Sequence, residues 1–182
     1  AFACHSRTVD IFVGEGDGDR AGLSCDSMDA PAVLAAVDDG AFGEQDALKL
    51  LEQRCELTDD HLGRTFWELE LGQELEGRGE HGRAHELFEK ILTIAPSNIG
   101  ALEGKKRTAR ALERWDVLVS TAEQLAELYQ EPASAADLWS QAAEACIAHL
   151  EDSDRAELCC RRALALEPTN SKSFVHLLKI LE

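Results

Sequence analysis

Aromatic residues make up only 5% of this 182-residue sequence. Sheets are usually rich in aromatic and β-branched residues, whereas alanine and leucine, which dominate the apolar residues here, favour helices. Long apolar runs are also missing, and none approaches the roughly 18 residues that a membrane-spanning helix needs. Because 45% of the residues are nevertheless hydrophobic, a buried core is expected. The composition predicts an all-α globular protein that does not insert into a membrane.

Basic residues are scarce as well, with 18 Lys and Arg against 35 Asp and Glu and a formal charge of −17. Residues 1–60 hold 14 acids and 4 bases, residues 61–114 hold 9 of each, and residues 115–182 hold 12 and 5. A nucleic-acid ligand requires a surplus of cations to neutralise its phosphates. We therefore expect no nucleic-acid partner.

The six cysteines show no CxxC spacing, so neither a zinc site nor a dense disulfide framework is indicated. Neighbouring residues on a helix point about 100° apart, so Cys159 and Cys160 do not readily bond each other. We expect Cys160 in the core, Cys159 near the surface, and Cys146 close to both across a helical hairpin. Cysteine usage favours a reducing, cytoplasmic location, with a periplasmic or lipoprotein-anchored location as the alternative suggested by "AFAC" at residues 1–4.

Signatures of catalysis are missing too. The stretch "GEGDGDRAG" (14–22) departs from GxGxxG because Asp19 occupies the last glycine position, and its acids would repel phosphate. A flexible acidic loop is favoured there over an ion site. His81 and His85 lie four residues apart without a third ligand, and we expect both to face solvent. No GxSxG or Cys/His signature occurs, so we predict no catalytic residue, metal or cofactor, and no enzyme.

One pattern of spacings, 4, 3 and 5 residues, occurs twice with an offset of 72 residues. Its members are Ala84, Phe88, Ile91 and Pro96, and then Ala156, Cys160, Ala163 and Pro168. A middle copy at Leu118, Ala122 and Leu125 follows the first by 34 residues and precedes the last by 38. These spacings place each set on one helix face. The four extra residues before the last copy are expected near Pro132, in a longer connection.

A period near 34 residues with two helices per copy resembles the tetratricopeptide repeat. The copies span about 65–98, 99–132 and 136–170, and residues 171–182 resemble the opening helix of a fourth. In the first copy, the pair Leu71-Gly72 matches the first helix, Gly79 and Gly82 separate the helices, and Ala84 opens the second. In the second copy Lys106 stands where a small residue belongs, so its helices are expected to lie farther apart.

This resemblance implies an all-α, right-handed superhelix of helical hairpins over residues 44–182. Residues 30–40 and 44–57 are together interpreted as two helices of a degenerate repeat or of an N-terminal cap. The preceding segment, 1–43, is expected to be irregular and acidic, with a short strand at 8–13 and a helix within 30–40. In the closing helix one stripe is predicted at Phe174, Leu177, Leu178 and Leu181, and the apolar residues Val175 and Ile180 lie off it. We therefore expect this helix to be covered by a continued array or by another chain.

The resemblance also implies function, because the first helices of such arrays line a concave face that binds peptides or partner helices. On that pattern the groove residues are Gln73, Arg107, Arg110, Lys172 and Lys179. Basic side chains in an acidic protein favour an acidic peptide segment, although the same residues also suit a solvated helix paired with nearby glutamates. We predict a protein–protein interaction scaffold of bacterial type. The alternatives are end-to-end stacking into a homo-oligomer through open array ends, and a regulatory arm of a larger enzyme.

The small residue that opens the second helix of the first copy provides a test. Replacing Ala84 by leucine should overpack the first hairpin and lower the free energy of unfolding by about 1–3 kcal/mol. Thermal denaturation measures the change, and a melting temperature equal to that of the wild type would contradict the alignment of the copies.

Overall fold

The structure, a computed structural model, describes residues 44–181. The chain divides into two units between Leu50 and Leu51, and the second unit, Leu51–Glu182, contains the helices discussed below from α3 onwards. The strand at 8–13, the acidic loop at 14–22 and the helix within 30–40, all predicted from sequence, lie outside the described residues.

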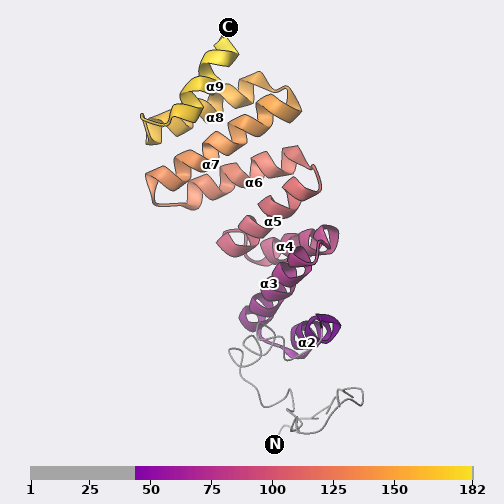
Figure 1. Cartoon of the computed structure of the whole chain (residues 1–182). Helices are drawn as coiled ribbons and strands as arrows, with labels where there is room; N and C mark the ends of the chain where they lie inside the picture. Colours follow the sequence, from indigo (N-terminus) through magenta and orange to yellow (C-terminus); the bar gives the residue numbers. More distant parts are fainter. Residues whose placement is uncertain (1–43, 182) are drawn as a thin grey trace, which may run out of the picture. The chain divides into compact units, whose positions relative to one another are not determined.

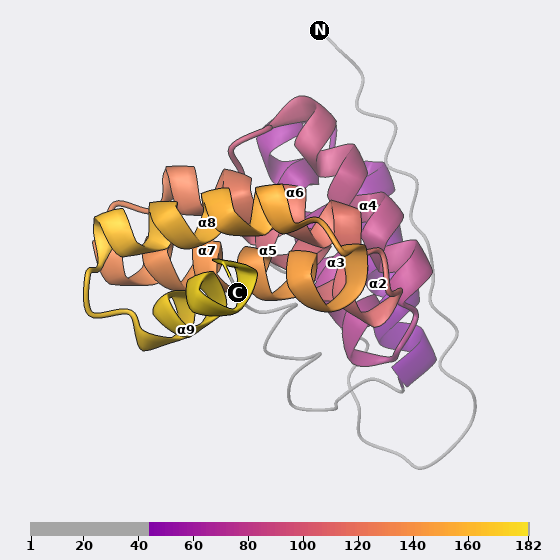
Figure 2. The same ribbon diagram turned by 90° about the horizontal axis from the view of Figure 1, so that it is seen from above.

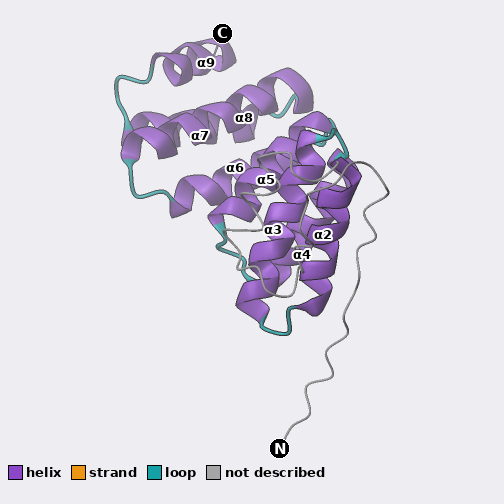
Figure 3. Ribbon diagram, turned by 60° about the horizontal axis from the view of Figure 1, so that its bottom comes forward, coloured by secondary structure: helices purple, strands orange, loops and turns teal. Residues whose placement is uncertain are grey.

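Residues 44–181 are helical, without a strand among them, and short loops join the helices (Figure 3). The helices are α2 (Glu44–Leu57), α3 (His61–Gly77), α4 (His81–Ile94), α5 (Ile99–Ala111), α6 (Trp115–Leu128), α7 (Pro132–Ala145), α8 (Ser153–Leu166) and α9 (Ser171–Leu181) (Figure 1). The all-α prediction is confirmed, and α2 matches the helix predicted over 44–57. In this part of the chain no helix is both long and apolar enough to cross a membrane.

From α3 onwards the helices form successive antiparallel hairpins, α3–α4, α5–α6 and α7–α8, followed by α9, and each helix packs on the next. In the view from above, α8 overlies α7 beside α9 (Figure 2). The predicted stripes are the buried ones: Phe88 on α4, Ala122 on α6 and Cys160 on α8 are each 0% exposed. Residues 84–91 and 156–163 therefore occupy equivalent second helices, as the repeated spacing predicts.

The three hairpin turns share one backbone feature, a residue with positive φ just after the first helix. Gly79 has φ 80°, Glu113 57° and Glu151 53°. In the first turn the Glu80 N–H donates to the Leu75 carbonyl at 2.9 Å, a pairing typical of a Schellman end. Only glycine adopts this conformation without strain, so the glutamates are held in it by the packing of their hairpins. Gly82, expected between the helices, lies instead in the first turn of α4.

The extra residues of the third copy lie in its first helix, and the prediction of a longer connection near Pro132 is wrong. Only three residues, 129–131, separate α6 from α7, and Pro132 is the first residue of α7. Proline suits that position because the first helical N–H has no partner within the helix. At its other end α7 continues into a π-helical turn, Cys146–Leu150. This turn lengthens the first helix of the third hairpin.

The ring of Phe88 lies between two glycines on neighbouring first helices. A Cβ added to Gly72 on α3 would be 2.7 Å from a ring carbon, and one added to Gly104 on α5 would be 2.4 Å away. Gly72 therefore lets α3 and α4 approach each other closely. The sequence pattern indicated that the second copy lacks a small residue, because Lys106 occupies the expected position. In the structure the close approach is made by Gly104 instead, against the Phe88 ring of the preceding hairpin.

Substitution of Gly104 tests this contact. Gly104→Ala should lower the free energy of unfolding by about 1–3 kcal/mol, because the ring has no space into which to move. Gly82→Ala is the matched control, since a Cβ there would have no atom within 4 Å, and it should be neutral or stabilising by up to about 1 kcal/mol. Chemical denaturation measures both. In a Phe88→Leu background the cost of Gly104→Ala should shrink, and an equal cost in both backgrounds would refute the clamp.

Candidate functional site: the face of the first helices

The first helices of the hairpins contact one another directly on one side of the array, α3 against α5 and α7 against α9. Four side chains of α3, at spacings of 3, 4 and 3 residues, lie on one stripe of that helix: Phe66, Leu69, Gln73 and Glu76. A Cβ on Gly100 of α5 would be 3.0 Å from the Leu69 side chain, so this stripe is the one that approaches α5. We call this side of the array, with the stripe and its partners on the later first helices, the first-helix face.

The predicted groove residues are all exposed, but the structure does not bring them into one cluster. Gln73 lies on α3, Arg107 and Arg110 on α5, and Lys172 and Lys179 on α9. Since α7 intervenes between α5 and α9, the two arginines and the two lysines form separate groups.

Two of these cations already have anionic partners. Arg107 donates from Nε and Nη2 to the two carboxylate oxygens of Glu76, at 2.7 and 2.8 Å, and this bond raises the pKa of its guanidinium. Lys172 Nζ lies 3.5 Å from Asp137 Oδ1 on α7. Within the described residues Arg110 and Lys179 form no such ion pair. The cationic character of the first-helix face therefore comes mainly from Arg110 and Lys179.

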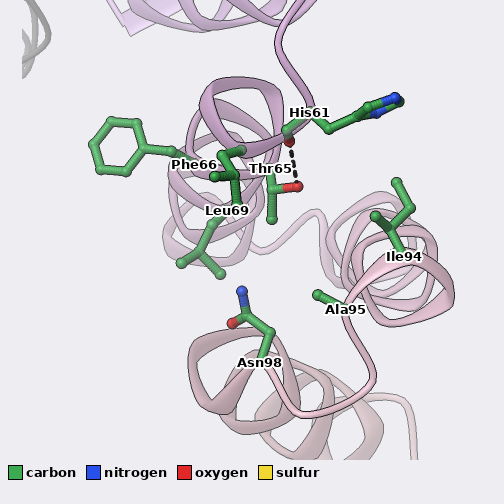
Figure 4. A pocket seen from close by; sticks show the side chains of 8 residues that line it. His61, Thr65, Phe66, Leu69, Ile94, Ala95 and Asn98 are labelled. Carbon is green, nitrogen blue, oxygen red and sulfur yellow. Dashed lines mark hydrogen bonds between the residues drawn. The ribbon is translucent and has the colours of Figure 1, made fainter.

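An apolar pocket of about 360 Å³ lies where the start of α3 meets the connection between α4 and α5 (Figure 4). Its lining consists of His61, Leu62, Thr65, Phe66, Leu69, Ile94, Ala95 and Asn98. Three of these large apolar side chains are unusually exposed for their type: Leu62 by 82%, Phe66 by 39% and Ile94 by 51%. Because Phe66 and Leu69 belong to the α3 stripe, the pocket continues the first-helix face at its apolar end.

Thr65 and Asn98, two of the polar residues at the pocket, make local hydrogen bonds within or next to their helices. The Thr65 hydroxyl donates to the His61 carbonyl at 2.8 Å, within α3. Asn98 caps α5, its side-chain oxygen accepting from the Ala101 N–H at 3.0 Å. The amide nitrogen of Asn98 lies on the side of Leu69 (Figure 4). A carbonyl or carboxylate of a ligand could accept a hydrogen bond there.

Sequence reasoning did not find this pocket, although a signal was present. Leu62, Phe66 and Leu69 follow one another at spacings of 4 and 3, a second apolar stripe beside the core stripe of α3. A helix with one buried face has no need of a second stripe. The tight α3–α5 approach, which turns the stripe into a pocket, depends on contacts between residues about 30 positions apart.

The expectation that His85 faces solvent is wrong, because its side chain is 1% exposed between α4 and α5. Its Nδ1 lies 2.9 Å from the Thr108 hydroxyl, which donates to the Gly104 carbonyl at 2.9 Å. Which of the two atoms donates depends on the imidazole tautomer, and on the other side of the ring Nε2 lies 3.7 Å from Glu89 Oε1. Desolvation lowers the pKa of His85, so the ring is neutral at pH 7. Among the described residues no three potential ligands gather to hold a metal ion.

The cysteine predictions are partly confirmed. Cys160 is in the core and Cys146 contacts its neighbours across the third hairpin, but Cys159, expected near the surface, is also 0% exposed. The extra residues of α7 and its π-helical turn place Cys146 against Cys159. Hydrogen bonding between the two sulfurs lowers the pKa of Cys146 and raises that of Cys159, which burial raises further. A thiol that stays protonated in the core is suited to packing and not to nucleophilic attack.

These features, stacked two-helix hairpins with buried stripes of fixed spacing, define a helical-repeat fold of the tetratricopeptide type. No protein-family model matches the chain, and no curated protein sequence matches it. Solved structures do match. A tetratricopeptide repeat protein from Parabacteroides merdae superposes with a TM-score of 0.64 at 16% identity, over 82% of this chain and 57% of that one.

MamA from Desulfovibrio magneticus RS-1 superposes with a TM-score of 0.58 at 19% identity, over 81% of this chain and 78% of MamA. A double mutant of MamA from RS-1 gives 0.59 at 18% identity, with the same coverage of 81% and 78%. At such identities the likeness concerns the fold. The chain thus has the tetratricopeptide-repeat fold, and the prediction made from its spacings is confirmed.

The burial of His85 predicts a pH dependence of stability. Because the folded-state pKa is lowered, the unfolded chain takes up a proton that the folded chain does not, and stability falls as the pH drops below the ordinary value of about 6.5. In His85→Gln the free energy of unfolding should fall less steeply between pH 7 and pH 5.5, since the carboxylates and other histidines are unchanged. Denaturant titrations at several pH values measure both slopes, and equal slopes would show that His85 is not the responsible group.

Proposed function

We propose that this protein is an interaction scaffold that binds a segment of a partner protein along the first-helix face, without catalysis. The observation that carries the proposal is the continuity of the α3 stripe. It begins with the apolar pocket at Phe66 and Leu69, passes Gln73 and ends at the Glu76–Arg107 pair. An apolar recess with a few oriented polar groups is the usual form of a recognition site. Helices hold these groups in place, so binding costs little ordering of the scaffold.

The ligand that suits this face has an apolar side chain for the pocket and a carboxylate near Arg110. Arg107 contributes less to attraction because Glu76 already neutralises it at 2.7 Å. The acidic-segment hypothesis therefore depends on Arg110, which has no ion pair among the described residues, and Lys179 lies too far along the array, on α9, to contact the same short peptide. A partner that contacts both would have to span α5, α7 and α9.

Stacking of copies end to end is the second candidate function, favoured by the apolar side chains that α9 exposes. We rank it below peptide binding because α9 offers roughly half or less of the ~800 Å² per partner that a stable interface buries. Light scattering over a range of concentrations separates the two, since stacking predicts a mass that rises with concentration.

Site-specific photo-crosslinking tests the proposed face. A photoreactive phenylalanine analogue at Gln73, in cells that produce the protein, should give a discrete crosslinked species. The matched control is the same replacement at Gln124, an exposed glutamine of the second helix α6, which should give none. Equal crosslinking at both positions, or none at Gln73, would contradict the proposal.

Two further variants test whether the pocket and Arg110 each contribute to binding at the first-helix face. Phe66→Asp should abolish the Gln73 crosslink by placing a charge in the pocket, with unchanged helix content by circular dichroism. Arg110→Glu should weaken it at least tenfold if the ligand is acidic. We prefer this single change to a double change that includes Arg107→Glu. Arg107→Glu would place a second carboxylate beside that of Glu76, and the two would repel each other. An unaffected crosslink in Arg110→Glu would remove the acidic requirement and leave the pocket as the determinant.

A further inference from the structure

Helices α3 and α5 meet in one register along the first-helix face. Leu69 approaches Gly100, where an added Cβ would lie 3.0 Å from the leucine side chain, and Glu76 bonds to Arg107. Both contacts join residues that are 31 positions apart in the sequence. This register decides which side chain of α3 lies opposite each side chain of α5.

Arg110 lies beyond the end of α3 in this register. The residue 31 positions before it is Gly79, which belongs to the turn after α3 and has no side chain. Arg110 is exposed and has no ion pair within residues 44–181. One helical turn to either side of it the chain has three bases and one acid, which are Lys106, Arg107, Arg114 and Glu113. A ligand carboxylate can therefore approach Arg110 without displacing another group.

Arg107, one turn earlier on α5, is closed to such a carboxylate by Glu76. Its Nε and Nη2 donate to the two oxygens of Glu76 at 2.7 and 2.8 Å, and bidentate pairs of this kind are among the stronger ones. The Glu76 side chain is only 17% exposed. The pKa of Arg107 is raised chiefly by this hydrogen bond and further by the charges of Glu76 and Glu103. A ligand carboxylate would have to displace Glu76 and then lie beside two other carboxylates.

The ion pair between the later first helices has a different character. Asp137 on α7 and Lys172 on α9 are joined by one contact of 3.5 Å, and their side chains are 50% and 70% exposed. An exposed pair with a single long contact contributes little. A ligand can therefore compete for Lys172, whereas Arg107 is held. The strong internal pair is a property of the α3–α5 part of the face.

The register also sets how far the pocket lies from each arginine. Gly100 marks the pocket end of α5, since it faces Leu69, which lines the pocket. At about 1.5 Å per helical residue, Arg107 lies about 10 Å and Arg110 about 15 Å farther along α5. An extended segment rises about 3.3 Å per residue. Counted from an apolar residue in the pocket, a segment laid along α5 reaches Arg107 after about three residues and Arg110 after about four or five.

We propose that Glu76 determines the position at which the first-helix face accepts an acid. It holds Arg107 in a bidentate ion pair and leaves Arg110 as the site for a ligand carboxylate. The partner is then an extended segment with an apolar residue for the pocket and an acid about four or five residues away, without an acid about three residues away. This inference rests on the proposed function, because it concerns the same face.

Selection from a display library of random octapeptides finds such segments without a known ligand. The full chain should enrich peptides in which an acid lies four or five residues from a large apolar residue, in either chain direction, and should deplete acids at three residues. Glu76→Gln should raise the frequency of acids at three residues by roughly fivefold or more, because an uncharged amide leaves the charge of Arg107 open to a ligand carboxylate. Equal frequencies with the wild type and with Glu76→Gln would overturn the inference.

Two further variants assign any change to the released arginine. Glu157→Gln removes the same charge and releases the exposed Arg161 on the second helix α8, and it should leave the acid frequencies within about twofold of the wild type. The double change of Glu76→Gln with Arg107→Gln should return the frequency at three residues to that of the wild type. A gain that Glu157→Gln reproduces, or that persists in the double variant, would show that net charge and not Arg107 is responsible, and would refute the role of Glu76.

The outcomes separate this inference from the proposed function. If no peptide is enriched, or if the enriched peptides still bind after Phe66→Asp, the face itself is refuted and the inference falls with it. If the enriched peptides require Phe66 but have the same acid positions with the wild type and with Glu76→Gln, the face stands and only the inference is wrong. Circular dichroism of each variant confirms that its helix content is that of the wild type.

Discussion

The contact on which the array depends is the enclosure of the Phe88 ring between Gly72 and Gly104. With hypothetical Cβ atoms only 2.7 and 2.4 Å from the ring, neither glycine position tolerates a side chain unless a helix moves. The ring belongs to α4 but touches first helices of two successive hairpins. One aromatic side chain therefore sets both the spacing within the first hairpin and the spacing to the second. Packed protein interiors do not compress, so this spacing also fixes the distance between the surface side chains of α3 and those of α5.

The first-helix face is built on this spacing. Leu69 approaches Gly100, and Arg107 reaches Glu76, only because α3 and α5 are held close together. The buried His85–Thr108 hydrogen bond ties α4 to α5 on the same side of the clamp. The pocket and its neighbouring ion pair are thus consequences of core packing, and a partner would meet a surface that is already formed.

In the third hairpin the contact between the two helices is made by smaller residues than in the first hairpin. Cys160 replaces Phe88 in the stripe and Ala163 replaces Ile91, so α7 and α8 pack through small side chains. The π-helical turn at the end of α7 brings Cys146 against Cys159 and fills part of the space. The contact with α9 is made partly by serines instead of a ring, which fixes its rotation by hydrogen bonds.

Spacing along the chain sufficed to predict the hairpins, their buried stripes and the tetratricopeptide fold, because a helix converts sequence distance into direction. The same rule placed Phe88 and Cys160 correctly in the core. It did not predict that His85 and Cys159 are buried, that Gly104 makes the close approach, or that Leu62 and Phe66 frame a pocket. Each of these depends on which helix lies opposite, at a separation of some 15–35 residues. Local periodicity tells which way a side chain points, and only the packed neighbours decide what it meets.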